Sequence, residues 1–201
     1  MRTSESNQDF RARRNLAPWH YTRRKEEIQH AMAKSSLGPI LVASSTKGLV
    51  SILFGNDREQ LIAALQRRFP QAQLVVGGSK AKHRAAQVAL FMEKPGRRLR
   101  LPLDIRGTEF QKKVWNAVLT IPAGQVITYA EVAHKIGVPK AVRAVGNACS
   151  MNKLSVAIPC HRVVRGNGSR SEKCPWGTGQ RGILIEREMS AGGSSPRKTR
   201  T

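Results

Sequence analysis

The chain has 201 residues, and its 35 Lys and Arg against 13 Asp and Glu give a formal net charge of +22 at neutral pH. That length allows one large domain or two small ones with a buried core. The charge exceeds what solubility requires and indicates a polyanionic partner, DNA or RNA in the first place. No apolar run is long enough to span a bilayer, so we expect no membrane association.

The two ends of the chain are basic and lack apolar periodicity. We expect residues 1–26 to form a flexible basic arm and residues 190–201 to form a disordered tail. The N-terminal segment lacks the apolar centre of a secretory signal, although its Arg content leaves an organelle transit peptide open. We therefore expect the protein in the cytoplasm, or in the nucleus of a eukaryotic cell. We also expect it to be a monomer.

Residues 40–56, ILVASSTKGLVSILFGN, consist of two β-prone runs around the turn-like tetrapeptide STKG, which predicts a β-hairpin. The next segment, DREQLIAALQRRF, places Leu61, Leu65 and Phe69 on one helical face. Asp57 is a favourable N-cap, so we expect a helix that begins there and ends before the following proline.

Residues 71–100 are basic and less regular, with a helix predicted over 85–92 and a turn over 93–98. After about residue 103, short capped helices are expected instead. Two segments carry the capping-box pattern, in which a Thr is followed three residues later by Gln or Glu. These pairs are Thr108 with Gln111 and Thr128 with Glu131.

The helix that starts after Thr128 is expected to end at Gly137 as its C′ residue. Pro139 then fits the first turn of another helix, in VPKAVRAVGNACSM, and the pair forms a helix-turn-helix pattern. This last helix is rich in small residues, which are Ala141, Ala144, Gly146 and Ala148. Such a helix either packs closely on another helix or lies in a DNA groove with Arg143 projecting from it.

The three cysteines, Cys149, Cys160 and Cys174, are an odd number without a C-x-x-C pair. A disulfide framework is therefore not expected, and the spacing does not match a structural zinc site. The sequence predicts neither a metal nor a cofactor.

Cys160 lies in AIPCHRVVRGNG, between a proline and His161. A thiol reacts as its thiolate, which a neighbouring base or positive charge favours. In an extended segment adjacent side chains point to opposite faces, so contact with His161 would need a water or a bend. His161 would also need an orienting carboxylate, for which Glu186 and Glu188 are the candidates. On these residues alone, a buried inert cysteine is favoured over a nucleophile.

Four segments together resemble the O6-alkylguanine-DNA alkyltransferases, a family of suicide DNA-repair proteins. They are LPLDIRGTEFQKKVW (101–115), TIPAGQVITYAEVAHKIG (120–137), KAVRAVGNACSMNKL (140–154) and IPCHRVV (158–164). These segments occur in the order and at the spacing of the family. The resemblance covers about residues 37–189. It is closest to the C-terminal half of the bacterial adaptive-response branch, which joins an alkyltransferase to a transcription activator.

The resemblance implies an α+β fold with two subdomains. Residues 27–102 would form a ribonuclease-H-like subdomain, with a small antiparallel sheet and a helix. Residues 103–189 would form a helical, winged-helix-like subdomain that binds DNA and carries the active site.

The resemblance also implies direct repair of O6-alkylguanine in DNA, with O4-alkylthymine as a further substrate. Cys160 would accept the alkyl group irreversibly, so each molecule would act once. His161 would deprotonate Cys160 through a water, and Glu188 would orient His161. Asn152 would hold the turn that leads to the active site. Tyr129 would contact the flipped nucleotide and help to protonate the departing guanine.

The implied partner is double-stranded DNA from which an alkylated base is flipped out. Arg143 would fill the space that the base leaves. The implied DNA-binding set consists of Arg143, Ala141, Ala144, Gly146 and Thr128. The backbone carbonyls of Cys160 and Val163 would bind the exocyclic amine of guanine, and Trp176 and Cys174 would complete the substrate pocket.

One loop departs from the family pattern. In GSRSEKCPWG, residues 168–177, one residue is inserted, and Lys173 or Cys174 stands where the family has a Tyr that stacks on guanine. Such stacking contributes about 1–3 kcal/mol. A protein that binds alkylated DNA without transfer is therefore the second functional hypothesis, and a cysteine hydrolase is the third. A disulfide between Cys160 and Cys174 under oxidising conditions is a further hypothesis.

Overall fold

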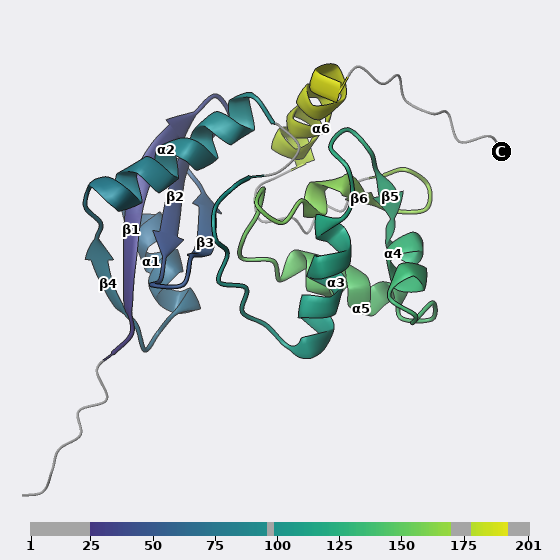
Figure 1. The fold of residues 1–201 in the computed structure, drawn as a ribbon, viewed down its shortest axis with the longest axis horizontal. Coiled ribbons are helices and arrows are strands. Elements are labelled where there is room, and N and C mark those ends of the chain that lie inside the picture. Colours follow the sequence, from purple (N-terminus) through teal and green to yellow (C-terminus); the bar gives the residue numbers. More distant parts are fainter. Residues whose placement is uncertain (1–24, 96–98, 170–177, 193–201) are drawn as a thin grey trace, which may run out of the picture.

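The computed structural model of the protein describes residues 25–95, 99–169 and 178–192. Figure 1 shows two halves side by side, a sheet with helices on both faces and a group of helices, with the last helix at the top between them. The α+β class expected from the sequence is confirmed. In the part of the chain that is described, no helix is long and apolar enough to cross a membrane.

The N-terminal half is built on a four-stranded sheet in the order β3-β2-β1-β4. Its strands are β1 (Glu27–Ser35), β2 (Gly38–Ser44), β3 (Leu49–Phe54) and β4 (Gln73–Val76). The predicted hairpin is confirmed as the antiparallel pair β2 and β3. Neither β1 nor β4 is among the strands expected from the sequence. Strand β4 pairs with β1 in parallel, so the sheet is mixed rather than antiparallel throughout.

Helices α1 (Arg58–Arg68) and α2 (Ser79–Glu93) cover opposite faces of this sheet (Figure 1). The N-cap of α1 is confirmed, because the Asp57 carboxylate accepts the backbone N–H groups of Glu59 and Gln60. The predicted apolar face of α1 is buried in a cluster that includes Leu61, Leu65, Phe69, Ile28 and Leu41.

Helix α2 is longer than the helix predicted over 85–92. Its buried face continues toward the N-terminus through Ala81, at helical spacing from Ala85, Val88 and Met92. Alanine is a strong helix former but only a weak marker of an apolar face. The polar stretch SKAKHR therefore hides the start of the helix in the sequence.

The C-terminal half is mainly helical. Its elements are α3 (Glu109–Leu119), β5 (Ile127–Thr128), α4 (Tyr129–Lys135), α5 (Val142–Ser150), the 3-10 turn η1 (Cys160–Arg162), β6 (Val163–Val164) and α6 (Thr178–Gly192). Both capping boxes are confirmed, those of Thr108 with Gln111 and of Thr128 with Glu131. Gly137 has a φ of +77°, the left-handed conformation expected of a C′ glycine.

Three boundaries differ from the prediction. Pro139 does not begin the second helix of the helix-turn-helix, because Ala141 N–H first closes a turn onto Val138 O at 2.9 Å and α5 begins only afterwards. Glu26 falls in the range expected as a flexible arm, but its carboxylate pairs with Arg106. Residues 190–192 belong to α6 and not to a tail.

The two halves are joined along β3. The N–H of Leu49 donates to the Pro102 carbonyl at 2.8 Å. Gly48 allows this close approach, because a Cβ at that position would lie 2.4 Å from the Pro102 oxygen. Further along β3, Ile52 N–H donates to the Lys153 carbonyl at 2.8 Å. The segment that follows α5 is therefore anchored to the sheet.

Trp115 ties α3 to α5, because its buried indole N–H donates to the Ala148 carbonyl at 2.9 Å. Phenylalanine would keep an apolar ring but would leave that buried carbonyl without this donor. We expect Trp115→Phe to lower the free energy of unfolding by roughly 1–3 kcal/mol, as measured by urea denaturation. A variant as stable as the wild type would show that this hydrogen bond does not hold the two helices together.

Candidate active site

Cys160 opens the turn η1 at the end of a segment that folds back on itself. The N–H of Ile158 donates to Leu154 O, and the N–H of Cys160 donates to Ile158 O, both at 2.8 Å. Within this segment Val156 has a φ of +73°, a left-handed conformation that β-branched residues rarely adopt. The segment is therefore bent rather than extended, and Cys160 remains partly exposed.

The buried amide of Asn152 links the two ends of this bend. Its Nδ2 donates to Ile158 O at 3.0 Å and to Cys160 Sγ at 3.3 Å. Its Oδ1 accepts the N–H of Leu154 at 2.8 Å. One side chain therefore fixes the backbone of the bend and also touches the sulfur.

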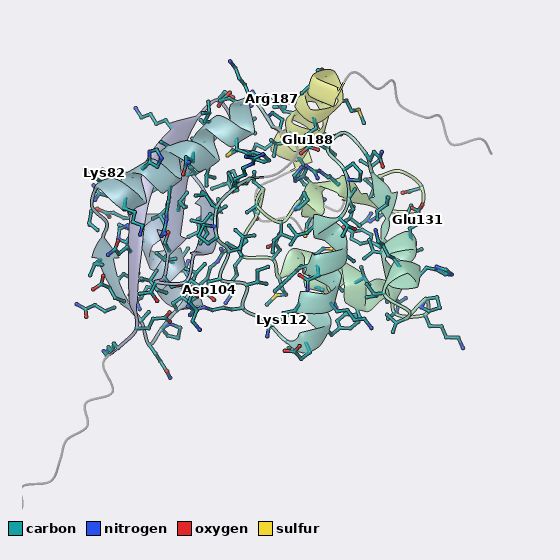
Figure 2. All side chains as sticks on the ribbon, in the orientation of Figure 1. Lys82, Asp104, Lys112, Glu131, Arg187 and Glu188 are labelled. Carbon is teal, nitrogen blue, oxygen red and sulfur yellow. The ribbon has the colours of Figure 1, made fainter. Side chains whose placement is uncertain are left out.

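Next to the cysteine, His161 points into the interior and contacts α6. Its Nε2 lies 2.9 Å from Glu188 Oε1. Arg162 binds the same carboxylate, with Nε 2.9 Å from Oε2 and Nη2 2.8 Å from Oε1. Arg162 Nη1 also donates to Ile121 O at 2.6 Å, and Gly124 N–H donates to Glu188 Oε2 at 3.2 Å. Figure 2 shows Glu188 on the side of α6 that faces the rest of the molecule.

Burial and hydrogen bonding set the ionisation of this pair. Burial lowers the pKa of His161, an effect that Glu188 opposes and Arg162 reinforces. Burial by itself raises the pKa of Glu188, but the hydrogen bonds from His161 and Arg162 outweigh it and lower that pKa to about 2. At neutral pH the pair is an ionised carboxylate and a neutral imidazole that can accept a proton. The alternative carboxylate, Glu186, is exposed.

The thiol of Cys160 has a second thiol beside it. A hydrogen bond with Cys149 and burial raise the pKa of Cys160 well above its usual value, whereas Asn152 and the positive charge of Arg181 lower it. Cys149 lies on the buried side of α5. The Cys160 thiol is therefore protonated at neutral pH and reacts only when a base takes its proton.

Tyr129 and Arg181 complete the surroundings of the cysteine. Tyr129 begins α4, and the pairing of β5 with β6 brings it close to the residues that follow η1. Arg181, on α6, donates its Nη2 to Cys160 O at 2.9 Å and to Val163 O at 3.3 Å. Burial raises the pKa of Tyr129, and a hydrogen bond with Arg181 offsets part of that rise. The two carbonyls predicted to bind guanine thus converge on one nitrogen.

The small residues of α5 divide between two faces. Ala148 and Cys149 are buried, whereas Arg143 and Ala144 are exposed and Gly146 is partly exposed. Each interpretation of the small-residue pattern therefore fits one face of the helix. We call the outer residues Arg143, Ala144 and Gly146 the exposed stripe of α5.

Two predicted DNA-binding residues lie apart from this stripe. Ala141 is the N-cap of α5. The Thr128 hydroxyl is bonded to Glu131 within the capping box of α4. Both residues therefore mark helix starts, and the Thr128 hydroxyl already has partners.

Part of the predicted pocket lies outside the described residues, namely Trp176, Cys174 and Lys173. Two arginines at the site, Arg162 and Arg181, are not among the residues expected from the sequence. Arg162 follows His161 directly, and this position next to a predicted His–Glu pair could have marked it as a second partner of Glu188. Nothing in the local pattern marks Arg181, whose partners depend on how α6 packs.

Two family models match the chain. The DNA-binding domain of 6-O-methylguanine DNA methyltransferase matches residues 109–190, and the ribonuclease-like domain of the same family matches residues 28–105.

Curated relatives cover most of the chain. It is 44% identical over 161 residues to the bifunctional transcriptional activator/DNA repair enzyme Ada of Escherichia coli K12. This match covers 80% of this chain and 45% of Ada. It is 39% identical over 129 residues to the inducible methylated-DNA–protein-cysteine methyltransferase of Bacillus subtilis, which covers 64% of this chain and 72% of that protein. The chain spans 45% of the length of Ada from E. coli and of its Salmonella typhimurium relative.

Solved structures show the same fold. OGT of Mycobacterium tuberculosis in complex with DNA matches with a TM-score of 0.66 at 28% identity, over 81% of this chain and 94% of that chain. The O6-methylguanine methyltransferase of the same organism matches with a TM-score of 0.67 at 28% identity, over 85% and 96%. The resemblance read from the four sequence segments is confirmed, and the chain belongs to the 6-O-methylguanine DNA methyltransferase family.

Proposed function

We propose that this chain repairs alkylated DNA by moving the alkyl group of O6-alkylguanine, or of O4-alkylthymine, irreversibly to Cys160. The observation that carries the proposal is the set of contacts around the sulfur. Asn152 touches it at 3.3 Å, and the adjoining residue His161 forms a buried pair with Glu188 at 2.9 Å. Relatives named methylated-DNA–protein-cysteine methyltransferases support this reaction class.

The proposed reaction begins when neutral His161 takes the thiol proton of Cys160 through a water and Glu188 stabilises the imidazolium. The thiolate attacks the alkyl carbon, so a carbon–sulfur bond forms as the carbon–O6 bond breaks. The electron pair of the broken bond leaves with guanine, and the Tyr129 hydroxyl helps to protonate it. No electrons are exchanged with a cofactor, and the stable thioether ends the working life of the molecule.

The proposed partner is double-stranded DNA with the damaged base flipped out of the stack. The exposed stripe of α5 suits a narrow groove, because small side chains let the helix approach closely while Arg143 fills the vacated space. The net charge of +22 supplies attraction to phosphates. A monomeric state and a cytoplasmic location stay predictions, as do the subdomain boundaries.

A protein that binds alkylated DNA without transfer is the second candidate. The sequence of residues 168–177, which lacks the stacking Tyr, favours it. The contact of Asn152 with the Cys160 sulfur, and the buried His161–Glu188 pair that follows Cys160 in the chain, favour transfer. A cysteine hydrolase would leave the charge of +22 without a role.

Incubation with duplex DNA that contains one O6-methylguanine tests the transfer directly. We expect the peptide that carries Cys160 to exchange one hydrogen for a methyl group, in an amount equal to the protein used. Cys160→Ser should lose this modification, and in Cys149→Ser it should stay on Cys160. Mass spectrometry of the digested protein gives the answer. Tight binding of the damaged duplex without a gain in mass would favour the second candidate.

Glu188→Gln tests the proposed base. Without the carboxylate the pKa of His161 falls further, so the imidazole is a weaker base and transfer should slow by about 10²-fold. The rate is full when His161 is neutral and is lost as the pH falls through its pKa, so the acid side of the rate–pH curve should move to lower pH. Single-turnover rates measure both effects.

Glu186→Gln is the matched control for this variant, because Glu186 is exposed on the same helix. It should keep the wild-type rate and pH curve. Circular dichroism should show that Glu188→Gln is folded although Arg162 has lost its partner. A slow Glu188→Gln protein whose acid side does not move would argue against His161 as the base.

Arg143→Ala tests the proposed flipping residue. Extrusion of a base from a duplex costs a few kcal/mol, and we expect Arg143 to offset part of this cost. Arg143→Ala should therefore slow transfer from duplex DNA by roughly tenfold and leave transfer from a single strand unchanged. Arg67→Ala, which removes an exposed charge from α1, is the control. Equal slowing on both substrates would point to general phosphate attraction instead.

A further inference from the structure

Arg181 connects three elements around the proposed nucleophile. From α6 its Nη2 donates to Cys160 O in η1 at 2.9 Å and to Val163 O in β6 at 3.3 Å. Its charge, together with a hydrogen bond, also lowers the pKa of Tyr129, the residue that begins α4. The reaction as proposed uses Cys160 and Tyr129 but gives Arg181 no part.

Arg181 is more deeply buried than Cys160 and Tyr129. Arg181 is 3% exposed, whereas Cys160 and Tyr129 are partly exposed. The guanidinium is therefore buried, beside two residues that remain partly exposed. A carbonyl oxygen has two lone pairs, so each carbonyl can accept Arg181 and a second N–H donor at the same time.

These contacts restrict the backbone that carries the sulfur. Cys160 and Val163 lie at the two ends of η1, and one nitrogen of Arg181 binds the carbonyls of both. Asn152 holds the preceding bend through Ile158 O. The nucleophile is therefore held from both directions along the chain. A displacement reaction needs the sulfur in line with the breaking bond, so a small shift in its place costs rate.

The positive charge of Arg181 favours alkyl transfer, as its hydrogen bonds to the turn do. Cys149 and burial raise the pKa of Cys160, and the guanidinium opposes them. It likewise offsets part of the rise that burial causes in the pKa of Tyr129. Negative charge is on the sulfur before transfer and on guanine after it, and a fixed positive charge close to both favours the reaction.

We propose that Arg181 is a positioning residue for alkyl transfer, which holds the Cys160–Val163 turn through two carbonyls and places a positive charge beside the turn and Tyr129. This inference rests on the proposed function. It gives α6 a second role besides that of carrying Glu188.

Two substitutions separate the charge of Arg181 from its hydrogen bonds. Arg181→Gln keeps a planar N–H donor but loses the charge, and Arg181→Lys keeps the charge on a single ammonium. A residue that merely stabilises the fold would change the stability and leave the pH dependence of transfer in place. A residue that acts through its charge moves the pH dependence, and the charged variant restores it.

The experiment measures single-turnover methyl transfer from an O6-methylguanine duplex at saturating DNA, against pH, with the full chain. We expect Arg181→Gln to be slower by on the order of tenfold or more. Its rate–pH curve should move to higher pH, because the charge of Arg181 lowers the pKa of His161, which sets the acid side of the curve, and also that of the Cys160 thiol. Arg181→Lys should return the curve toward that of the wild type. Arg67→Gln is the charge-matched control and should match the wild type in rate, curve and DNA affinity.

A rate and curve of Arg181→Gln equal to those of Arg67→Gln would overturn this inference, and so would a slow variant whose curve does not move. If the wild type transfers no methyl group, the proposed function has failed instead. If Arg181→Gln does not fold, the positioning role is tested instead on Cys160→Ser bound to the same duplex, by NMR of the Arg181 guanidinium protons. Arg181 Nη–H signals that stay protected in NMR spectra support the positioning role, and signals lost on DNA binding contradict it.

Discussion

One buried carboxylate, that of Glu188, organises the C-terminal half of the molecule. It accepts hydrogen bonds from His161, Arg162 and the N–H of Gly124. A lone carboxylate in the interior would be strongly destabilising, and here a bidentate guanidinium and further donors offset that cost. The same contacts keep Glu188 ionised and His161 oriented. The stability of the fold and the proton chemistry of the site therefore depend on a single group.

The preceding residue extends this coupling to the other half. Arg187 donates to Met92 O at 2.7 Å and to Ser36 Oγ at 2.6 Å, and it lies 3.3 Å from Glu93. Figure 2 shows Arg187 and Glu188 side by side on α6. Consecutive residues thus bind α6 to the sheet half and to the site. The N-terminal half therefore acts as the support that places the helix with Glu188 and Arg181.

Interactions between residues close together in the chain could be predicted from the sequence, and those between distant residues could not. The caps at Asp57, Thr108 and Thr128 are side chain to backbone bonds within three residues, so the sequence alone determines them. Strand β4 depends on its pairing with β1 across the intervening hairpin and α1, and the sequence of β1, EIQHAMAKS, has too few apolar residues to show the alternation that its burial has. The family motifs marked Cys160, Asn152, His161 and Glu188, whose contacts the structure shows, but their ionisation depends on burial that only the folded chain defines. Arg181 depends on the packing of α6 in the same way.

In the proposed reaction Cys160 is a nucleophile that is used once, and its raised pKa suits that role. A thiolate kept permanently in place would react with any small electrophile, and each such reaction would consume a molecule. Cys149 and burial keep the thiol protonated, while His161 stays neutral beside it. A bound base presents its alkyl group at an effective concentration on the order of 10⁵ M or more, which outweighs a small thiolate fraction. Reactivity thus depends on what DNA binding places against the sulfur, rather than on the sulfur alone.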